Sequence, residues 1–193
     1  MKKIISIIFS LCLVLCVSAQ AVSPHMTFKG ISIDGTIESF SQKLVEKGFT
    51  VVGANSQMVA LSGTFAGFEG CTVAVNSLEK KNLTSMVVVM FPEKDKWAVL
   101  EAQYAYLKDM LTEKYGKAAK NTEAFKGQVG NEDKDKLQKL IADECTYESV
   151  FATAYGVIKL QISHAKSAKC YVSLGYIDAK NSDPKRQAAM DDL

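Results

Sequence analysis

Two stretches of this chain share a pattern that constrains the fold more than any other feature of the sequence. The first, Phe65 to Val75, reads FAGFEGCTVAV, and the second, Phe151 to Ile162, reads FATAYGVIKLQI. In each, Phe-Ala precedes a turn with glycine and then alternating apolar residues, which is typical of a hairpin with a half-buried strand. The pattern predicts a duplicated unit, because a unit that cannot bury its apolar face alone gains a core when a second copy packs beside it.

A second match extends the repeat to the preceding helix. Leu44-Val45-Glu46-Lys47-Gly48 resembles Leu111-Thr112-Glu113-Lys114-Tyr115-Gly116, and the offset grows from 68 residues at Gly48 and Gly116 to 86 residues at Phe65 and Phe151. An insertion therefore lies between the helix and the later strands of the second copy. The predicted fold class is α+β: two tandem α-β-β-β-β units whose helices pack on one face of an antiparallel sheet, as a two-layer sandwich.

Hydrophobic periodicity places the elements of each unit. Asp34-Gly35-Thr36 predicts a turn and cap before a first helix with a stripe at Ile37, Phe40, Leu44 and Val45, which ends at Gly48. Asp95 is expected to cap a second helix that ends at Gly116. The apolar stripe of that helix is assigned to the core, and it consists of Trp97, Leu100, Tyr104, Leu107 and Leu111.

Strands follow each helix. In the first unit they are expected at 49–52, 58–66, 71–77 and 84–91, with 67–70 as a turn, and an extended segment at 26–33 precedes the helix. The last of these strands is apolar on both faces, which predicts a central place in the sheet. In the second unit strands are expected at 117–125, 146–154, 156–164 and 169–177, with an inserted helix at 131–142 that is buried through Leu137, Leu140 and Ile141.

The beginning of the chain has the features of a secretory signal peptide. Lys2 and Lys3 are followed by an apolar run over 4–17 and by Ala19-Gln20-Ala21, a small-x-small cleavage site. The run is shorter than the roughly 20 residues that span a bilayer, so no transmembrane helix is expected in the mature chain. Cys16 follows the large Leu15, where lipid-modification sites have a small residue, so a lipid anchor at Cys16 is not expected. The predicted location is periplasmic or extracellular.

The domain organisation follows from these assignments. Residues 1–21 form the signal peptide, 22–92 the first repeat, 93–178 the second repeat with its inserted helix, and 179–193 a polar tail. Loss of Lys2 and Lys3 reduces 23 basic residues to 21, which equals the 21 acidic residues. A neutral chain predicts no nucleic-acid partner, because phosphate binding depends on an excess of basic side chains.

Candidates for chemistry are few. Cys71, Cys145 and Cys170 remain after cleavage, and their spacing fits no zinc motif, so small buried strand residues are expected, with any disulfide left open. His25 is expected to lie in a mobile segment. Glu132-Asp133-Asp135 and Asp191-Asp192 lack the alternating loop of a calcium site. Neither a metal nor a cofactor is expected.

Alternation along the strands identifies the candidate binding site. If the helices cover the side of Leu61, Val73, Ile158 and Leu174, a polar set of side chains projects from the opposite, uncovered face. That set consists of Ser62, Thr64, Thr72, Asn76, Glu148, Lys159, Gln161, Tyr171 and Ser173. The first hypothesis is therefore a non-enzymatic binding module of the cell envelope that contacts another protein through this face.

Two further hypotheses stay open. A hydrolase using Cys170 with His164 is conceivable because a hairpin places them near each other, although the sequence shows no third group to orient the base. The other is a structural envelope protein that self-associates. No feature of the sequence decides the oligomeric state.

The segments FKGISIDGTIESFSQKLVEKGF and YGVIKL and the final DDL resemble a group of uncharacterised exported proteins of Bacteroidetes. This resemblance implies source and location and carries no known activity. In repeat topology alone, the chain also resembles β-lactamase inhibitor protein and the SmpA-type outer-membrane assembly lipoproteins. That second resemblance implies binding to another protein across an open sheet face, as an analogy of fold.

Overall fold

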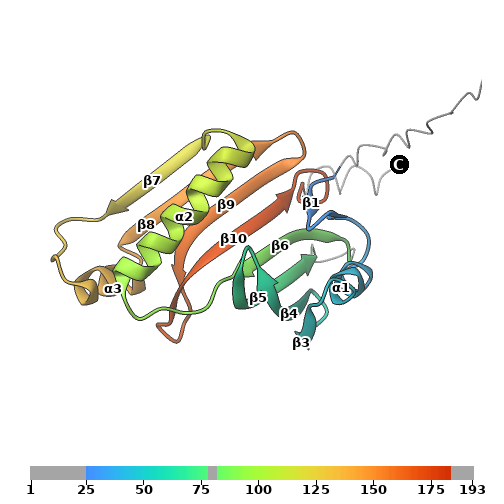
Figure 1. The fold of residues 1–193 in the computed structure, drawn as a ribbon, viewed down its shortest axis with the longest axis horizontal. Helices are drawn as coiled ribbons and strands as arrows, with labels where there is room; N and C mark the ends of the chain where they lie inside the picture. The colour runs from blue at the N-terminus through green and yellow to red at the C-terminus, as the bar shows by residue number, and fades with distance from the viewer. Residues whose placement is uncertain (1–24, 78–81, 184–193) are drawn as a thin grey trace, which may run out of the picture.

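The computed structural model describes residues 25–77 and 82–183 (Figure 1). Within them, helices pack on a large antiparallel sheet of eight strands, and a two-stranded sheet lies beside it. The predicted α+β class is confirmed. The predicted signal peptide and residues 184–193 of the predicted tail lie outside the described residues, as does most of the turn before β6.

The first part of the chain contributes one helix and the strands of one side of the sheet. Its elements are β1 (Thr27–Phe28), β2 (Ile31–Ser32), α1 (Ile37–Val45), β3 (Thr50–Ala54), β4 (Met58–Phe65), β5 (Phe68–Ser77) and β6 (Thr84–Met90). Thr36 caps α1 by accepting a hydrogen bond from the backbone N–H of Ser39, and Gly48 after the helix has a φ of 90°. The predicted cap and end of this helix are confirmed.

The second part contributes two helices and the other strands. Its elements are α2 (Trp97–Tyr115), β7 (Lys120–Phe125), α3 (Asp133–Ile141), β8 (Cys145–Thr153), β9 (Gly156–His164) and β10 (Cys170–Asp178). The spatial order of the large sheet is β3-β4-β5-β6-β10-β9-β8-β7, and each neighbouring pair is antiparallel. Because β6 and β10 meet in the middle, the predicted central place of the strand at 84–91 is confirmed.

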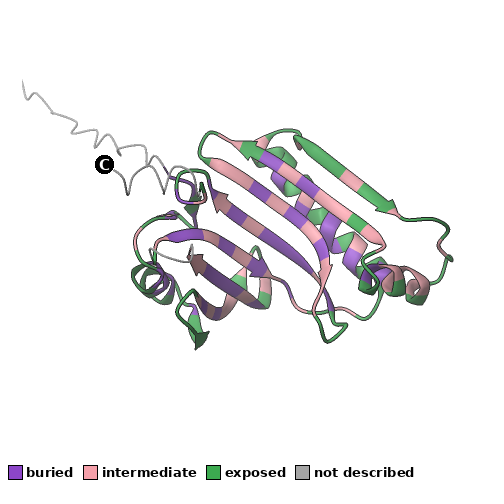
Figure 2. Cartoon of the chain, turned by 180° about the vertical axis from the view of Figure 1, so that it is seen from behind, coloured by how far each residue is buried: buried purple, intermediate pink, exposed green. Residues whose placement is uncertain are grey.

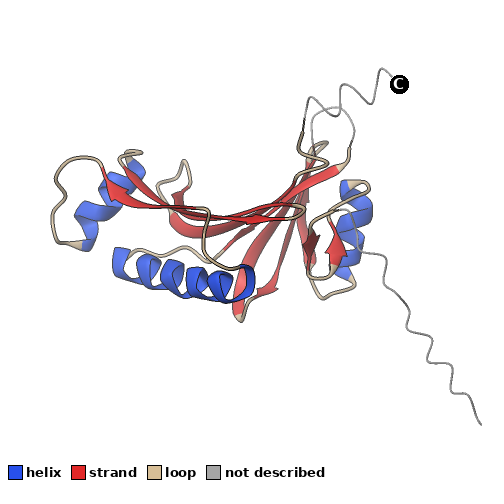
Figure 3. Cartoon of the chain, turned by 90° about the horizontal axis from the view of Figure 1, so that it is seen from above, coloured by secondary structure: helices blue, strands red, loops and turns tan. Residues whose placement is uncertain are grey.

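One face of the sheet carries the core. Leu61, Val73, Val89, Leu174 and Leu160 are successive register partners across β4, β5, β6, β10 and β9, and each is at most 2% exposed. Helix α1 packs on β4 and β5, and α2 packs on β8, β9 and β10, so the core residues of both helices belong to this same cluster. We call this side the helix face. Figure 3 shows the sheet edge-on, strongly twisted, with the helices beside it.

Two expectations about turns and caps are wrong. β5 begins at Phe68, three residues earlier than predicted, because Ala66 (φ 50°) and Gly67 (φ 82°) form a two-residue turn of the kind that matches strand twist. Asp95 does not cap α2, since the N-cap is Lys96, which has no side-chain hydrogen bond. Asp133 at the start of α3 instead accepts a hydrogen bond from the N–H of Ala98, at 3.1 Å.

Two further expectations about burial need correction. Ile141 of α3 is 38% exposed, and Leu140 is the residue of this short helix that is buried where α3 packs against α2, β8 and β9. His25 does not lie in a mobile segment, because its side chain is 5% exposed and pairs with Asp178 at the end of β10.

Candidate functional site

The candidate site is the face of the large sheet opposite the helices, which we call the open face. Figure 2 shows this side of β8, β9 and β10, with α2 behind the strands. Its side chains form three rows that run across the strands at right angles to them, as the pleat requires. Each row takes one residue from each successive strand.

The rows follow from the register. The Ser62 row consists of Ser62, Thr72, Met90, Ser173, Gln161 and Glu148. The Val88 row consists of Ala60, Ala74, Val88, Gly175, Lys159, Val150 and Lys120. The Met86 row consists of Met58, Asn76, Met86, Ile177, Val157 and Ala152.

The structure brings most of the predicted site residues together. Five of them form the Ser62 row, namely Ser62, Thr72, Ser173, Gln161 and Glu148, and Lys159 and Asn76 belong to the two neighbouring rows. Tyr171, the second residue of β10, is opposite Ser163 and lies outside the three rows. Thr64 falls in the register shift between Gly63 and Phe65, so it stands outside the rows. Ser173 is 4% exposed and offers little surface.

Sequence reasoning missed the apolar centre of this face. The predicted set is polar, yet β6 contributes Met86, Val88 and Met90, all partly exposed, and β10 contributes Ile177. The signal was present in the sequence, because a strand that is apolar on both sides places an apolar stripe on the open face as well. The open face is therefore an apolar stripe over β6 and β10 with hydroxyl and amide side chains around it.

One ion-pair cluster lies at the β7 side of the open face. Glu148 accepts from Lys159 through Oε2 at 2.7 Å and from Lys120 through Oε1 at 3.0 Å. The hydrogen bond from Lys159 is the largest cause that holds the pKa of Glu148 below its ordinary value. Two lysines and one glutamate give this cluster a net charge of +1. The carboxylate is 15% exposed, whereas the side chains of Lys159 and Lys120 are 39% and 64% exposed.

Cys170 and His164, the residues of the hydrolase hypothesis, are register partners in the β9–β10 hairpin. The Cys170 thiol points to the carbonyl of Ala168 at 3.6 Å, and burial raises the pKa of this thiol. His164 has Nε2 at 3.1 Å from Asp143 and Nδ1 at 3.1 Å from the carbonyl of Ala165. The hydrogen bond to Asp143 is the largest cause that raises the pKa of His164. Both ring nitrogens lie against oxygen atoms of Asp143 and Ala165, and neither is paired with the Cys170 thiol as a catalytic base would be.

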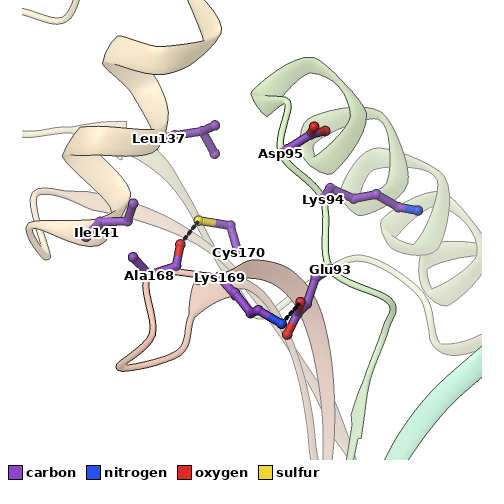
Figure 4. Close-up of a pocket in the computed structure, with 8 residues that line it drawn as sticks. All are labelled: Glu93, Lys94, Asp95, Leu137, Ile141, Ala168, Lys169 and Cys170. Carbon is purple, nitrogen blue, oxygen red and sulfur yellow. Dashed lines mark hydrogen bonds and ion pairs between the residues drawn. The ribbon is translucent and has the colours of Figure 1, made fainter.

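A cleft of about 690 Å³ lies beside Cys170, between α3 and the segment that leads into α2. Figure 4 shows Leu137 and Ile141 of α3 on one side and Glu93 paired with Lys169 on the other, at 2.8 Å. The pKa of Cys170 is raised, whereas nucleophilic cysteines have a lowered pKa. Burial therefore opposes formation of the Cys170 thiolate in this cleft.

The three cysteines of the described residues are free. Cys71 and Cys170 are buried and Cys145 is partly buried, and burial raises the pKa of each thiol, to about 11 for Cys145 with a contribution from Glu101. No group of three or more His, Cys, Asp or Glu side chains suited to a metal ion occurs in residues 25–77 and 82–183.

A polar node ties the first described residues to the last ones. The buried carboxylate of Asp178 accepts from the N–H of Met26 at 2.6 Å and the N–H of Asn181 at 2.9 Å, and it lies 3.1 Å from Nδ1 of His25. The Asn181 amide donates to the carbonyls of Ile33 and Thr84. These bonds give buried backbone groups near both ends of the described chain a side-chain partner, so the node connects the two ends.

Among the described residues, no helix is both long and apolar enough to cross a membrane. Comparison of the chain with protein-family models, with curated proteins and with solved structures found no match.

Proposed function

We propose that this protein is an exported, non-enzymatic binding protein of the cell envelope, and that it contacts another protein through the open face. The apolar stripe of Met86, Val88, Met90 and Ile177 is the observation that carries the proposal. These side chains lie on the face that α1 and α2 leave uncovered, at the centre of the sheet. Partly exposed apolar side chains that adjoin one another are typical of interaction sites.

The surroundings of the stripe suit an interface. Thr72 offers a hydroxyl group beside Met90, and Ser62 and Gln161 offer polar groups farther out in the same row. Tyr171 offers an aromatic ring near the start of β10. Apolar centres with polar rims are the usual anatomy of interfaces between proteins. Strands also hold these groups more rigidly than loops, which reduces the entropy that binding costs.

Two tandem units are part of the same proposal. The element order α1-β3-β4-β5-β6 is followed by α2-β7-α3-β8-β9-β10, and the last strand of each series meets the other at the centre of the sheet. Joining two units through β6 and β10 doubles the width of the open face. A duplicated unit would explain why the apolar stripe lies at the junction.

Site-specific photo-crosslinking in producing cells tests the proposal. A photoreactive residue is placed at Met86 on the open face or, as a matched control, at Met110, which is 43% exposed on α2. We expect a discrete crosslinked product of the mature protein from position 86 and none from position 110. Ala60 on β4, two strands from β6 on the same face, provides a second position if the Met86 variant does not fold. Equal products from 86 and 110, or none from 60 and 86, would contradict the proposal.

A further inference from the structure

The charges of the open face are confined to one side of it. Within the three rows, the charged residues are Lys120, Glu148 and Lys159, which lie on β7, β8 and β9. The rows carry no charged side chain on β4, β5, β6 or β10. The face therefore joins a neutral apolar area to a basic corner.

The basic corner presents ammonium groups rather than the carboxylate. Glu148 lies between the two lysines and is the least exposed of the three, at 15%. Both of its oxygens are already engaged, at 3.0 Å and 2.7 Å. Each ammonium has three donors, so both lysines retain donors toward a molecule that covers the face.

The apolar area is suited to a partner of adaptable shape. Met58, Met86 and Met90 come from β4 and β6, and unbranched methionine side chains adjust to different apolar surfaces. The small residues Ala74 and Gly175 flank Val88, with Ala60 beyond Ala74, and they keep the centre of the face shallow. An inserted apolar side chain would meet the methionines there.

We propose that the partner is a protein segment with apolar side chains followed by acidic ones. The apolar side chains lie over Met86 and Val88, and the acidic side chains pair with Lys120 and Lys159. This inference rests on the proposed function and adds the chemistry of the partner. Charge complementarity of this kind sets specificity and association rate more than affinity, and salt screens it.

Selection from a random peptide library displayed on phage tests the inference without a known partner. The probe is the library, selected on the mature protein and counter-selected on the Met86→Glu variant. We expect enriched peptides to combine apolar residues with Asp or Glu. Enrichment of apolar peptides with no acidic bias overturns the charge inference and leaves the docking face in place. Recovery of no peptide that depends on Met86 counts against the proposed function itself.

Binding of one enriched synthetic peptide then isolates the charges. Lys120→Gln with Lys159→Gln changes the cluster from +1 to −1, and we expect at least about tenfold weaker binding at low salt. Glu148→Gln changes it to +2 and should leave binding equal or tighter. Lys108→Gln is the control, because Lys108 belongs to α2 and pairs with Glu123 on the helix face, away from the open face. Unchanged binding by the double variant overturns the inference, as does sedimentation showing that a second copy of this chain occupies the face.

Discussion

Nδ1 of His25 lies 3.1 Å from Oδ2 of Asp178, although 153 residues separate them in the chain. Asp178 is fully buried, and its two oxygens also accept the N–H groups of Met26 and Asn181. The carboxylate therefore holds the start of the described chain against the residues that follow β10. Loss of it would leave several buried donors without an acceptor.

The first prediction concerns this carboxylate. Asp178→Ala should lower the free energy of unfolding by about 2–5 kcal/mol, because it leaves the buried N–H groups of Met26 and Asn181 without their acceptor at about 1–3 kcal/mol each. Urea denaturation of protein produced from residue 22 onward measures the change. Asp109→Ala, at an exposed position of α2, is the control and should stay within about 0.5 kcal/mol of the wild type. A loss below 1 kcal/mol for Asp178→Ala would show that water replaces the carboxylate.

A second prediction separates the two faces of β6. Val89 is fully buried on the helix face, and the adjacent Val88 lies on the open face. Val89→Ala should cost about 2 kcal/mol of stability because it leaves a small cavity in the core, whereas Val88→Ala should cost less than about 1 kcal/mol. Thermal or urea unfolding of the two variants checks this. Equal losses would mean that another part of the chain covers the open face.

The third prediction concerns close packing at Gly63. A Cβ at this position would lie against the ring of Phe49, with Cε1 at 2.8 Å and Cγ at 3.0 Å. Gly63→Ala should therefore cost about 1–3 kcal/mol through overpacking. Gly53→Ala, where no atom lies within 4 Å, is the matched control on the neighbouring strand. In a Phe49→Leu background the cost at Gly63 should fall, and a double-mutant cycle of unfolding free energies measures the coupling.

The fourth prediction concerns thiol reactivity. Burial is the largest cause that raises the pKa of Cys145 to about 11, and it also raises the pKa values of Cys71 and Cys170. At pH 8 only about one Cys145 thiol in a thousand would be ionised, so alkylation should be far slower than for a free cysteine with a pKa of about 8.5. For protein produced from residue 22 onward, which has Cys71, Cys145 and Cys170, mass spectrometry after maleimide treatment should show slow labelling in the native state and three rapid additions in denaturant. Rapid labelling of native Cys170 would instead revive the hydrolase hypothesis.

The fifth prediction concerns the pH dependence of the β9–β10 hairpin. The hydrogen bond to Asp143 is the largest cause that raises the pKa of His164 in the folded protein. The pairing therefore stabilises the fold at pH values below about 6.5, the pKa of an unfolded histidine, and the effect is lost as the pH rises through the higher folded value. Asp143 is 90% exposed, so the contribution should be below about 1 kcal/mol.

An NMR titration of the His164 ring measures that pKa directly. The Asp143→Asn variant should return it toward the ordinary value for histidine, because the carboxylate charge is lost. An unchanged titration in this variant would show that the carbonyl of Ala165 alone sets the pKa.

Local patterns in the sequence determined the kinds of elements and their order. The 3.6-residue spacing of Trp97, Leu100 and Tyr104 identified α2, since a helix of this length needs one buried stripe, and alternation identified the strands. The same alternation predicted that Ser62, Thr72 and Gln161 share one face, and the register places all three in one row across the sheet. Signals of this kind depend only on residues a few positions apart.

Only the tertiary structure decided what depends on contacts between distant residues. Pairing of β6 with β10 places Met86 beside Ile177 and Val88 beside Gly175. The centre of the open face is therefore apolar, and the predicted polar side chains lie around it. Likewise, Asp133 and not Asp95 accepts a hydrogen bond from the first turn of α2, and His25 is buried beside Asp178. Contacts between residues far apart in the chain produce no periodic pattern in the sequence. Each partner by itself resembles an ordinary polar or apolar residue.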